Sequence, residues 1–298
     1  MILTKLDEIV KIAVEKPTQR LAIAASADIH VLEAVKMATE MNIITPVFFG
    51  DKNETLRFAN EIGFDISGFQ LVDQSDPGLA AEEAVKAISG GNADILMKGM
   101  VSTAPLLKAV LNKEFGLKKR DVLSHLAIFQ TSFYHKLLGV TDAAMNIVPG
   151  LEEKKSILEN AVEVFRSLGV ELPKVAALGP LEVVNEKILS TVDAAQLKSL
   201  NIQGKINSCL VDGPLALDNA VSLKASSLKG IHSEVAGDAD ILLTPDLNSG
   251  NILYKSLIFL SDGLSAAVIL GARVPVVLTS RADSEQSKLY SIALAAAI

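Results

Sequence analysis

Five polar loops rich in small residues carry the side chains of this 298-residue chain that are best suited to chemistry. Each loop follows a short apolar run, and such runs predict strands. Ligands of open α/β sheets gather at the carboxyl ends of the strands. The candidate site therefore consists of the loops at residues 98–104, 141–144, 212–219, 245–251 and 279–283.

The loop KGMVSTA predicts an anion site. It places Lys98, Gly99, Ser102 and Thr103 at the start of a predicted helix, where free backbone N–H groups and the helix dipole favour negative charge. The chain lacks the GxxxxGK[ST] motif of a Walker-type phosphate loop. A plain N-cap role for Ser102 or Thr103 is the alternative interpretation.

A second anion site is predicted at Thr279-Ser280-Arg281, which ends a Val-rich strand and opens the last helix. Arginine binds oxyanions through two parallel hydrogen bonds. The alternative is a helix cap beside a surface arginine. The carboxylates Asp212, Asp218 and Asp246 lie in the glycine-containing loops DGPLALDN and PDLNSGN, and each is either a base, a ligand for a substrate amide, or a turn-stabilising side chain.

Metal and thiol chemistry are not indicated. The four histidines show no HExxH or similar spacing, so we expect no catalytic metal, and His125 and His135 are interpreted as structural. Cys209 is the one cysteine, which excludes an intrachain disulfide and indicates a reduced compartment. Because it lies in a strand-like run, a buried thiol is expected rather than a nucleophile.

Charge and hydropathy limit the partners. A net charge of −7 argues against nucleic acid, which requires a basic surface, but allows a small anion in a local site. The first residues do not resemble a signal peptide, and no stretch approaches the ~20 apolar residues that span a bilayer. We therefore expect a cytoplasmic protein that does not enter a membrane.

Short apolar runs alternate with longer amphipathic runs along the whole chain, which predicts βαβ units and an α/β fold with mainly parallel sheets. The length favours two domains with a cleft between them, because single cores rarely exceed roughly 250 residues.

The order and wording of the loops resemble the phosphate acetyl/butyryl transferase superfamily, and phosphate butyryltransferases in particular. The resemblance rests on KGMVSTAPLLKAVLNKEFGL, YHKLLGVTDAAMNI, STVDAAQL, GKINSCLVDGPLALDNAVS, KGIHSEVAGDADILLTPDLNSGNILYK and GARVPVVLTSRADS, from about residue 95 to the end. The acetyl branch follows its G-N-x-x-Y-K motif with Q-R-L, whereas this chain has Ile258-Phe259-Leu260. The acetyl branch also has an acidic residue several positions after its S-R pair. The corresponding position in this chain falls near Ser287, and the nearest carboxylates are Asp283 and Glu285.

The resemblance implies two three-layer α/β/α domains like those of isocitrate and isopropylmalate dehydrogenases, with the active site in the cleft. The first domain would combine residues 1–141 with 265–298, and the second would span 142–264. A homodimer or larger homo-oligomer is implied. The implied reaction is acyl-CoA + phosphate = acyl phosphate + CoA, by direct attack in a ternary complex, with CoA and acyl-CoA as substrates and no permanently bound cofactor.

The resemblance also assigns roles to residues. The catalytic set would be Ser280, Arg281, Asp283 and Asp212, with Ser280 on the developing oxyanion or the thiol, Arg281 on phosphate, and Asp283 or Asp212 as the base. The substrate-binding set would be Lys98, Gly99, Ser102, Thr103, Thr141, Asp142, Gly213, Pro214, Asp218, Asn219, Gly250 and Asn251.

Three alternatives stay open at this point. A phosphate acetyltransferase differs only in the acyl group, and the sequence leaves the preference among acetyl, butyryl and branched chains undecided. A metal- and nicotinamide-dependent hydroxyacid dehydrogenase would share the fold, but would require clustered metal-binding carboxylates and a dinucleotide site. A non-catalytic CoA-binding member of the family is the third.

Overall fold

The computed structural model describes residues 2–261, 263–279 and 283–298, and the chain divides into two compact units. The terminal unit contains residues 7–121 and 266–298, and the central unit contains residues 2–6 and 122–265. Residues 122–141 belong to the central unit, where β5 (Ser124–Gln130) pairs antiparallel with β6 (Leu138–Thr141). The domain bounds implied by the resemblance, 1–141 with 265–298 and 142–264, stay a prediction.

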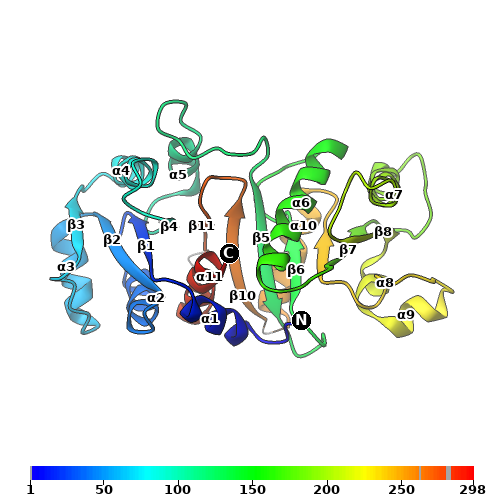
Figure 1. Ribbon diagram of the computed structural model, residues 1–298, viewed down its shortest axis with the longest axis horizontal. Helices are drawn as coiled ribbons and strands as arrows, with labels where there is room; N and C mark the ends of the chain where they lie inside the picture. Colours follow the sequence, from blue (N-terminus) through cyan, green and yellow to red (C-terminus); the bar gives the residue numbers. More distant parts are fainter. Residues whose placement is uncertain (1, 262, 280–282) are drawn as a thin grey trace. The chain divides into compact units, whose positions relative to one another are not determined.

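The strands of the terminal unit follow the order β3-β2-β1-β4-β11-β10 (Figure 1). Their bounds are β1 (Gln19–Ala24), β2 (Ile44–Gly50), β3 (Gln70–Asp73), β4 (Ile95–Lys98), β10 (Leu264–Leu270) and β11 (Val276–Val277). All neighbours are parallel except β10 and β11. Because β4 lies between β1 and β11, the carboxyl ends of these three strands are adjacent.

The helices of the terminal unit are α1 (Leu6–Glu15), α2 (Ile29–Glu40), α3 (Lys52–Glu61), α4 (Pro77–Ser89), α5 (Thr103–Val110) and α11 (Glu285–Ala297). Asp28, Asp51 and Asp76 each accept a backbone N–H from the third residue of the helix that they cap. Right-handed crossovers place α2 and α3 on the face opposite α4, because the strand order reverses after β3. Accordingly, α2 packs with α11, and α4 with α5 (Figure 1).

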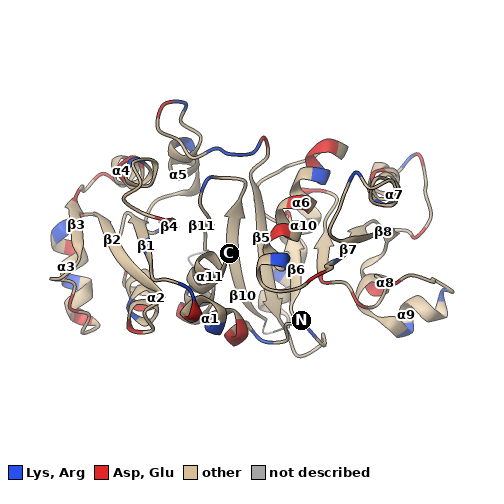
Figure 2. Cartoon of the chain, viewed as in Figure 1, with Lys and Arg blue, Asp and Glu red and all other residues tan. Residues whose placement is uncertain are grey.

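The central unit has the strand order β5-β6-β9-β7-β8, with β6, β9, β7 and β8 mutually parallel. The bounds of the remaining elements are β7 (Lys174–Leu178), β8 (Leu210–Leu215), β9 (Ile241–Leu243), α6 (Leu151–Ser167), α7 (Leu189–Ile202), α8 (Leu217–Val221), α9 (Leu223–Leu228) and α10 (Leu247–Phe259). The strands of both units carry few charged residues (Figure 2). Most charged residues lie on the helices and loops.

An ionic network lies at the amino ends of the parallel strands of the central unit. Lys136 Nζ lies 3.0 Å from Asp238 and 2.7 Å from Asp240, and Lys174 Nζ lies 2.6 Å from Asp238. Nε2 of His135 contacts Asp238 at 2.8 Å. Burial opposes ionisation of Asp238, but the hydrogen bonds from Lys174, His135 and Lys136 outweigh it and hold the pKa of this carboxyl well below its usual range.

The described part of the chain contains no helix that is both long enough and apolar enough to cross a membrane.

Candidate active site

The carboxyl ends of β6 and β9 hold the first group of predicted residues together. Asp142 follows β6, and its Oδ1 accepts backbone hydrogen bonds from Ala144 at 2.9 Å and Met145 at 3.0 Å. Its Oδ2 accepts a 2.6 Å hydrogen bond from Asn146 Nδ2. The carboxylate is buried, and its hydrogen bonds hold the loop after β6 in place.

The first turn of α10 packs against this loop. Thr244 follows β9, and its hydroxyl donates to the Asp142 carbonyl oxygen at 3.0 Å. A Cβ added to Gly250 would clash with the Asp142 carbonyl oxygen and would stand 2.7 Å from Thr244 Oγ1. Asn251 Nδ2 donates to the Ala143 carbonyl oxygen at 3.3 Å. The structure therefore brings Thr141, Asp142, Gly250 and Asn251 together. The close contact between the backbones of Gly250 and Asp142 is one that only glycine permits.

Asp212, Gly213 and Pro214 lie inside β8 and do not form a loop after it, which corrects the loop expected to begin at residue 212. Asp212 pairs with Ala176 of β7 in the parallel register. The Asp212 carboxylate forms a 2.7 Å ion pair with Lys198 and accepts the Gly213 N–H at 2.8 Å. Proline is tolerated here because β8 is the last strand in the order of the central unit.

Asp218 and Asn219 lie in the short helix α8, at the carboxyl end of β8. Lys229 bridges Asp218 at 3.2 Å and Glu182 at 2.6 Å. Asn219 is fully buried and donates its amide to Glu182. The hydrogen bond from Lys229 holds the pKa of Glu182 below its ordinary value. Glu182 and Lys229 were not predicted, and only the fold shows that they lie beside Asp218.

The loop after β4 in the terminal unit begins with a close backbone contact. The N–H groups of Gly99 and Met100 donate to the carbonyl oxygens of Ala24 and Ala25 at 2.8 and 2.7 Å. A Cβ on Gly99 would overlap the Ala25 oxygen and stand 2.8 Å from the Ala24 oxygen. Lys98 is buried, and its ammonium donates to the carbonyl oxygens of Gly99 and Val101 at 3.2 Å each. A positive charge is thus fixed inside this loop.

Ser102 is the N-cap residue of α5, but its side chain makes no capping hydrogen bond. Its backbone is extended, with φ −71° and ψ 156°, and the side chain is exposed. By contrast, Asp28 at the start of α2 accepts the N–H of Val31 at 3.0 Å. The exposed Ser102 hydroxyl lies at the open start of α5, next to the loop that buries the Lys98 ammonium.

Ser280 and Arg281 lie outside the described residues, and so does Ala282. The described neighbours on either side are Thr279, which is buried and follows β11, and Asp283, which precedes α11. Because β11 runs parallel beside β4, Thr279 and Lys98 stand at neighbouring carboxyl ends. The Asp283 carbonyl oxygen accepts a hydrogen bond from Lys288, and Ser284 caps α11 by accepting the Ser287 N–H.

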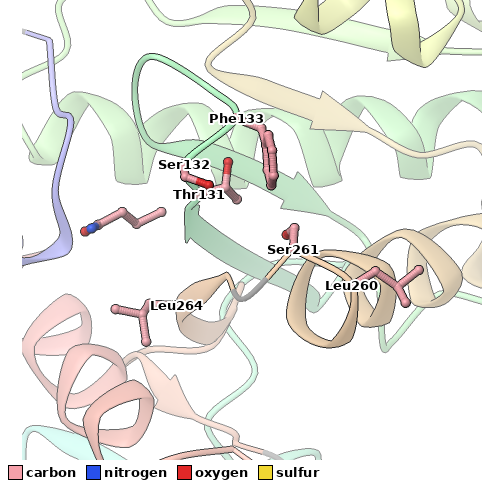
Figure 3. Close-up of a pocket in the computed structure, with 7 residues that line it drawn as sticks. Thr131, Ser132, Phe133, Leu260, Ser261 and Leu264 are labelled. Atoms are coloured by element: carbon pink, nitrogen blue, oxygen red, sulfur yellow. The ribbon is translucent and has the colours of Figure 1, made fainter.

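Two other features lie apart from the predicted residues. A hollow of about 390 Å³ lies between the segment after β5 and the end of α10 (Figure 3), and none of its lining residues is a predicted site residue.

Cys209 is buried, and burial raises the pKa of its thiol to about 11, which disfavours the nucleophilic thiolate. The expectation of a buried thiol is confirmed.

The mainly parallel strands with helices packed on them define an α/β protein, and such sheets bind their ligands at the carboxyl ends of the strands. The sequence pattern described as phosphate acetyl/butaryl transferase matches residues 5–80 and 78–296. The chain belongs to this family.

Individual relatives span nearly the whole chain. The phosphate butyryltransferase of Clostridium beijerinckii is 45% identical over 292 residues, covering 98% of this chain and 97% of its own. A phosphate acetyltransferase of Thermotoga maritima is 44% identical over 291 residues, covering 98% of both chains. The crystal structure of a branched-chain phosphotransacylase from Enterococcus faecalis superimposes with a TM-score of 0.83 at 36% identity, covering 93% of this chain and 98% of that one.

Proposed function

We propose that this protein transfers a butyryl group, or a similar short or branched acyl group, reversibly between CoA and phosphate. The observation that supports the phosphate site best is the start of α5. There the N-cap serine does not use its hydroxyl for capping, and a buried lysine places positive charge in the preceding loop. Free helix N–H groups, a hydroxyl and an ammonium together suit a phosphate.

The reaction needs no covalent enzyme intermediate. Towards acyl phosphate, a phosphate oxygen attacks the thioester carbonyl, the C–O bond forms, the C–S bond breaks, and the CoA thiolate leaves. In the reverse direction the CoA thiol loses its proton to a base, and its sulfur displaces phosphate from the acyl carbon. Both directions pass through a tetrahedral oxyanion. Holding the two substrates together supplies much of the rate enhancement.

We assign Arg281 and the loop at 98–104 to phosphate, and Ser280 to the developing oxyanion or the thiol. For the base we favour Asp283 over Asp212. Asp212 is committed to Lys198 and to the Gly213 N–H inside β8, whereas Asp283 lies next to the Ser280–Ala282 segment. A base typically contributes about 10²- to 10⁴-fold in rate.

The acyl group is the point on which the relatives differ. Relatives of nearly equal identity are named phosphate butyryltransferase and phosphate acetyltransferase. Acetyl-CoA is therefore the second candidate substrate. One methylene is worth only about 1 to 3 kcal/mol in a pocket, so we expect a graded preference.

The test is phosphate-dependent release of free thiol from acetyl-, butyryl- and isobutyryl-CoA, with a phosphate-free sample of each as the control. Faster release from butyryl- or isobutyryl-CoA supports the proposal. Faster release from acetyl-CoA would favour the second candidate, and binding of CoA without release would indicate a non-catalytic member.

We also propose a homodimer or larger homo-oligomer, from the family resemblance, and a cytoplasmic location, from the cysteine content and hydropathy of the sequence. Light scattering coupled to size-exclusion chromatography would measure the assembly.

A further inference from the structure

The first turns of α2 and α11 bring three metal-ligating side chains together within the terminal unit. His30 and Glu33 come from α2, and Glu285 is the first residue of α11. Nδ1 of His30 lies 2.8 Å from Oε1 of Glu285 and 3.3 Å from Oε2 of Glu33. One nitrogen and one oxygen from each carboxylate all lie within 4.8 Å of one another.

A proton alone satisfies this arrangement poorly. An imidazole nitrogen carries at most one hydrogen, yet two carboxylates face the same nitrogen of His30. The two carboxylates also repel each other at this separation. A cation in place of the proton would accept electron pairs from all three side chains at once and would balance both negative charges.

The donor set selects the kind of cation. One imidazole nitrogen with two carboxylate oxygens suits zinc, cobalt, nickel or manganese better than magnesium or calcium, which prefer oxygen alone. Zinc bonds of about 2.0 to 2.2 Å in tetrahedral geometry place ligand atoms roughly 3.4 Å apart. The 2.8 and 3.3 Å separations from Nδ1 of His30 need only small adjustment, and the two carboxylate oxygens lie within 4.8 Å of each other. An open hollow of about 600 Å³ has Glu33 and Glu285 on its wall, which gives a hydrated ion access.

We propose that His30, Glu33 and Glu285 bind one divalent transition-metal ion, which ties the start of α2 to the start of α11. Water completes the coordination, because the three side chains are 56, 37 and 42% exposed. The ion is structural and takes no part in acyl transfer. No sequence motif could reveal this site, because Glu285 lies far along the chain from His30 and Glu33.

The experiment titrates zinc into chelator-treated full-length protein by calorimetry. We expect one zinc per chain, with affinity reduced at least about 10- to 100-fold in His30→Ala and in Glu285→Gln. The controls are His232→Ala, which removes an exposed histidine of the central unit, and Glu40→Gln, which removes an exposed carboxylate of α2. Both controls should bind zinc as the wild type does.

Hydrogen exchange supplies a second readout that does not depend on activity. Zinc should slow amide exchange in the first turns of α2 and α11 of the wild type, and should leave His30→Ala unchanged. The absence of saturable binding would overturn the proposal. Equal zinc affinity in His30→Ala and His232→Ala, or unchanged exchange in α11 of the zinc-loaded wild type, would also overturn it.

Discussion

Gly250, in the first turns of α10, lies against the backbone of Asp142, so that any Cβ at this position would clash with the Asp142 carbonyl oxygen. In an ordinary helix, glycine to alanine stabilises by about 1 kcal/mol. Here the loop after β6 would have to move, so we predict that Gly250→Ala lowers the free energy of unfolding by about 1 to 3 kcal/mol and reduces activity. Urea denaturation measures the loss.

The matched control for this prediction is Gly68→Ala. No heavy atom lies within 4 Å of the Cβ that it would add. We expect Gly68→Ala to keep wild-type stability and turnover. Equal stability of the two variants would show that the packing of Gly250 on Asp142 is not tight.

Ser102→Ala should separate phosphate binding from helix capping. Since the Ser102 side chain makes no capping hydrogen bond, we expect the free energy of unfolding to change by less than about 0.5 kcal/mol. The KM for phosphate should rise, with the KM for butyryl-CoA nearly unchanged. Asp76→Ala removes a true cap, which accepts the Leu79 N–H at 2.8 Å, and should cost about 0.5 to 2 kcal/mol without changing the KM for phosphate. An unchanged KM for phosphate in Ser102→Ala would remove Ser102 from the phosphate site.

The two candidate bases can be told apart by kinetics. Asp283→Asn should lower kcat by about 10²- to 10⁴-fold, because the base would be lost. Asp212→Asn should mainly lower stability, because Lys198 loses its ion-pair partner. Measurements of kcat and of urea denaturation on both variants decide the assignment. A larger loss of kcat in Asp212→Asn than in Asp283→Asn would reverse it.

Asp238 should make stability depend on acid pH. Its pKa is lowered in the folded state, so its contribution is fully present above the unfolded value of about 3.9 and is lost as the pH falls through the folded pKa. Asp238→Asn should therefore flatten the fall in unfolding free energy below about pH 4. At pH 7 the free energy of unfolding of the variant should be lower by about 1 to 2 kcal/mol. We expect a small loss because Asp238 is 39% exposed and solvent screens its ion pairs.

The control for the pH prediction is Asp121→Asn, which changes a fully exposed carboxylate 3.9 Å from Lys118. Its stability should follow the wild-type curve across the same pH range. If Asp238→Asn also follows that curve, the ionic network at the amino ends of β6, β9 and β7 does not contribute to the acid transition.

The alternating pattern of the sequence predicted most strands of the sheets, because buried parallel strands form short apolar runs between amphipathic helices. It ended β8 too early, because Asp212, Gly213 and Pro214 are typical turn residues and yet lie within the strand, where Asp212 pairs with Ala176 of β7. Hydrogen bonding across an outer strand overrode the local turn preference. The antiparallel pairing of β5 with β6 could not be predicted either, because it is a tertiary contact with no local signal.

The candidate loops could be predicted because each follows a predicted strand. The residues that contact these loops in the fold could not be predicted. Glu182 lies 47 residues before Lys229 along the chain. Only folding brings Glu182 beside Lys229 and Asp218. Thr244 likewise contacts Asp142 across 102 residues. Such partners depend on strand order, which a single sequence does not contain.

The most direct test of the central claim is a product balance for butyryl-CoA and phosphate. Purified protein is mixed with both, free CoA is measured with a thiol reagent, and butyryl phosphate is trapped with hydroxylamine as its hydroxamate. We predict equal amounts of the two products, neither of which forms without phosphate. Release of CoA without butyryl phosphate, or no release at all from any short acyl-CoA, would contradict the assignment of acyl transfer to phosphate.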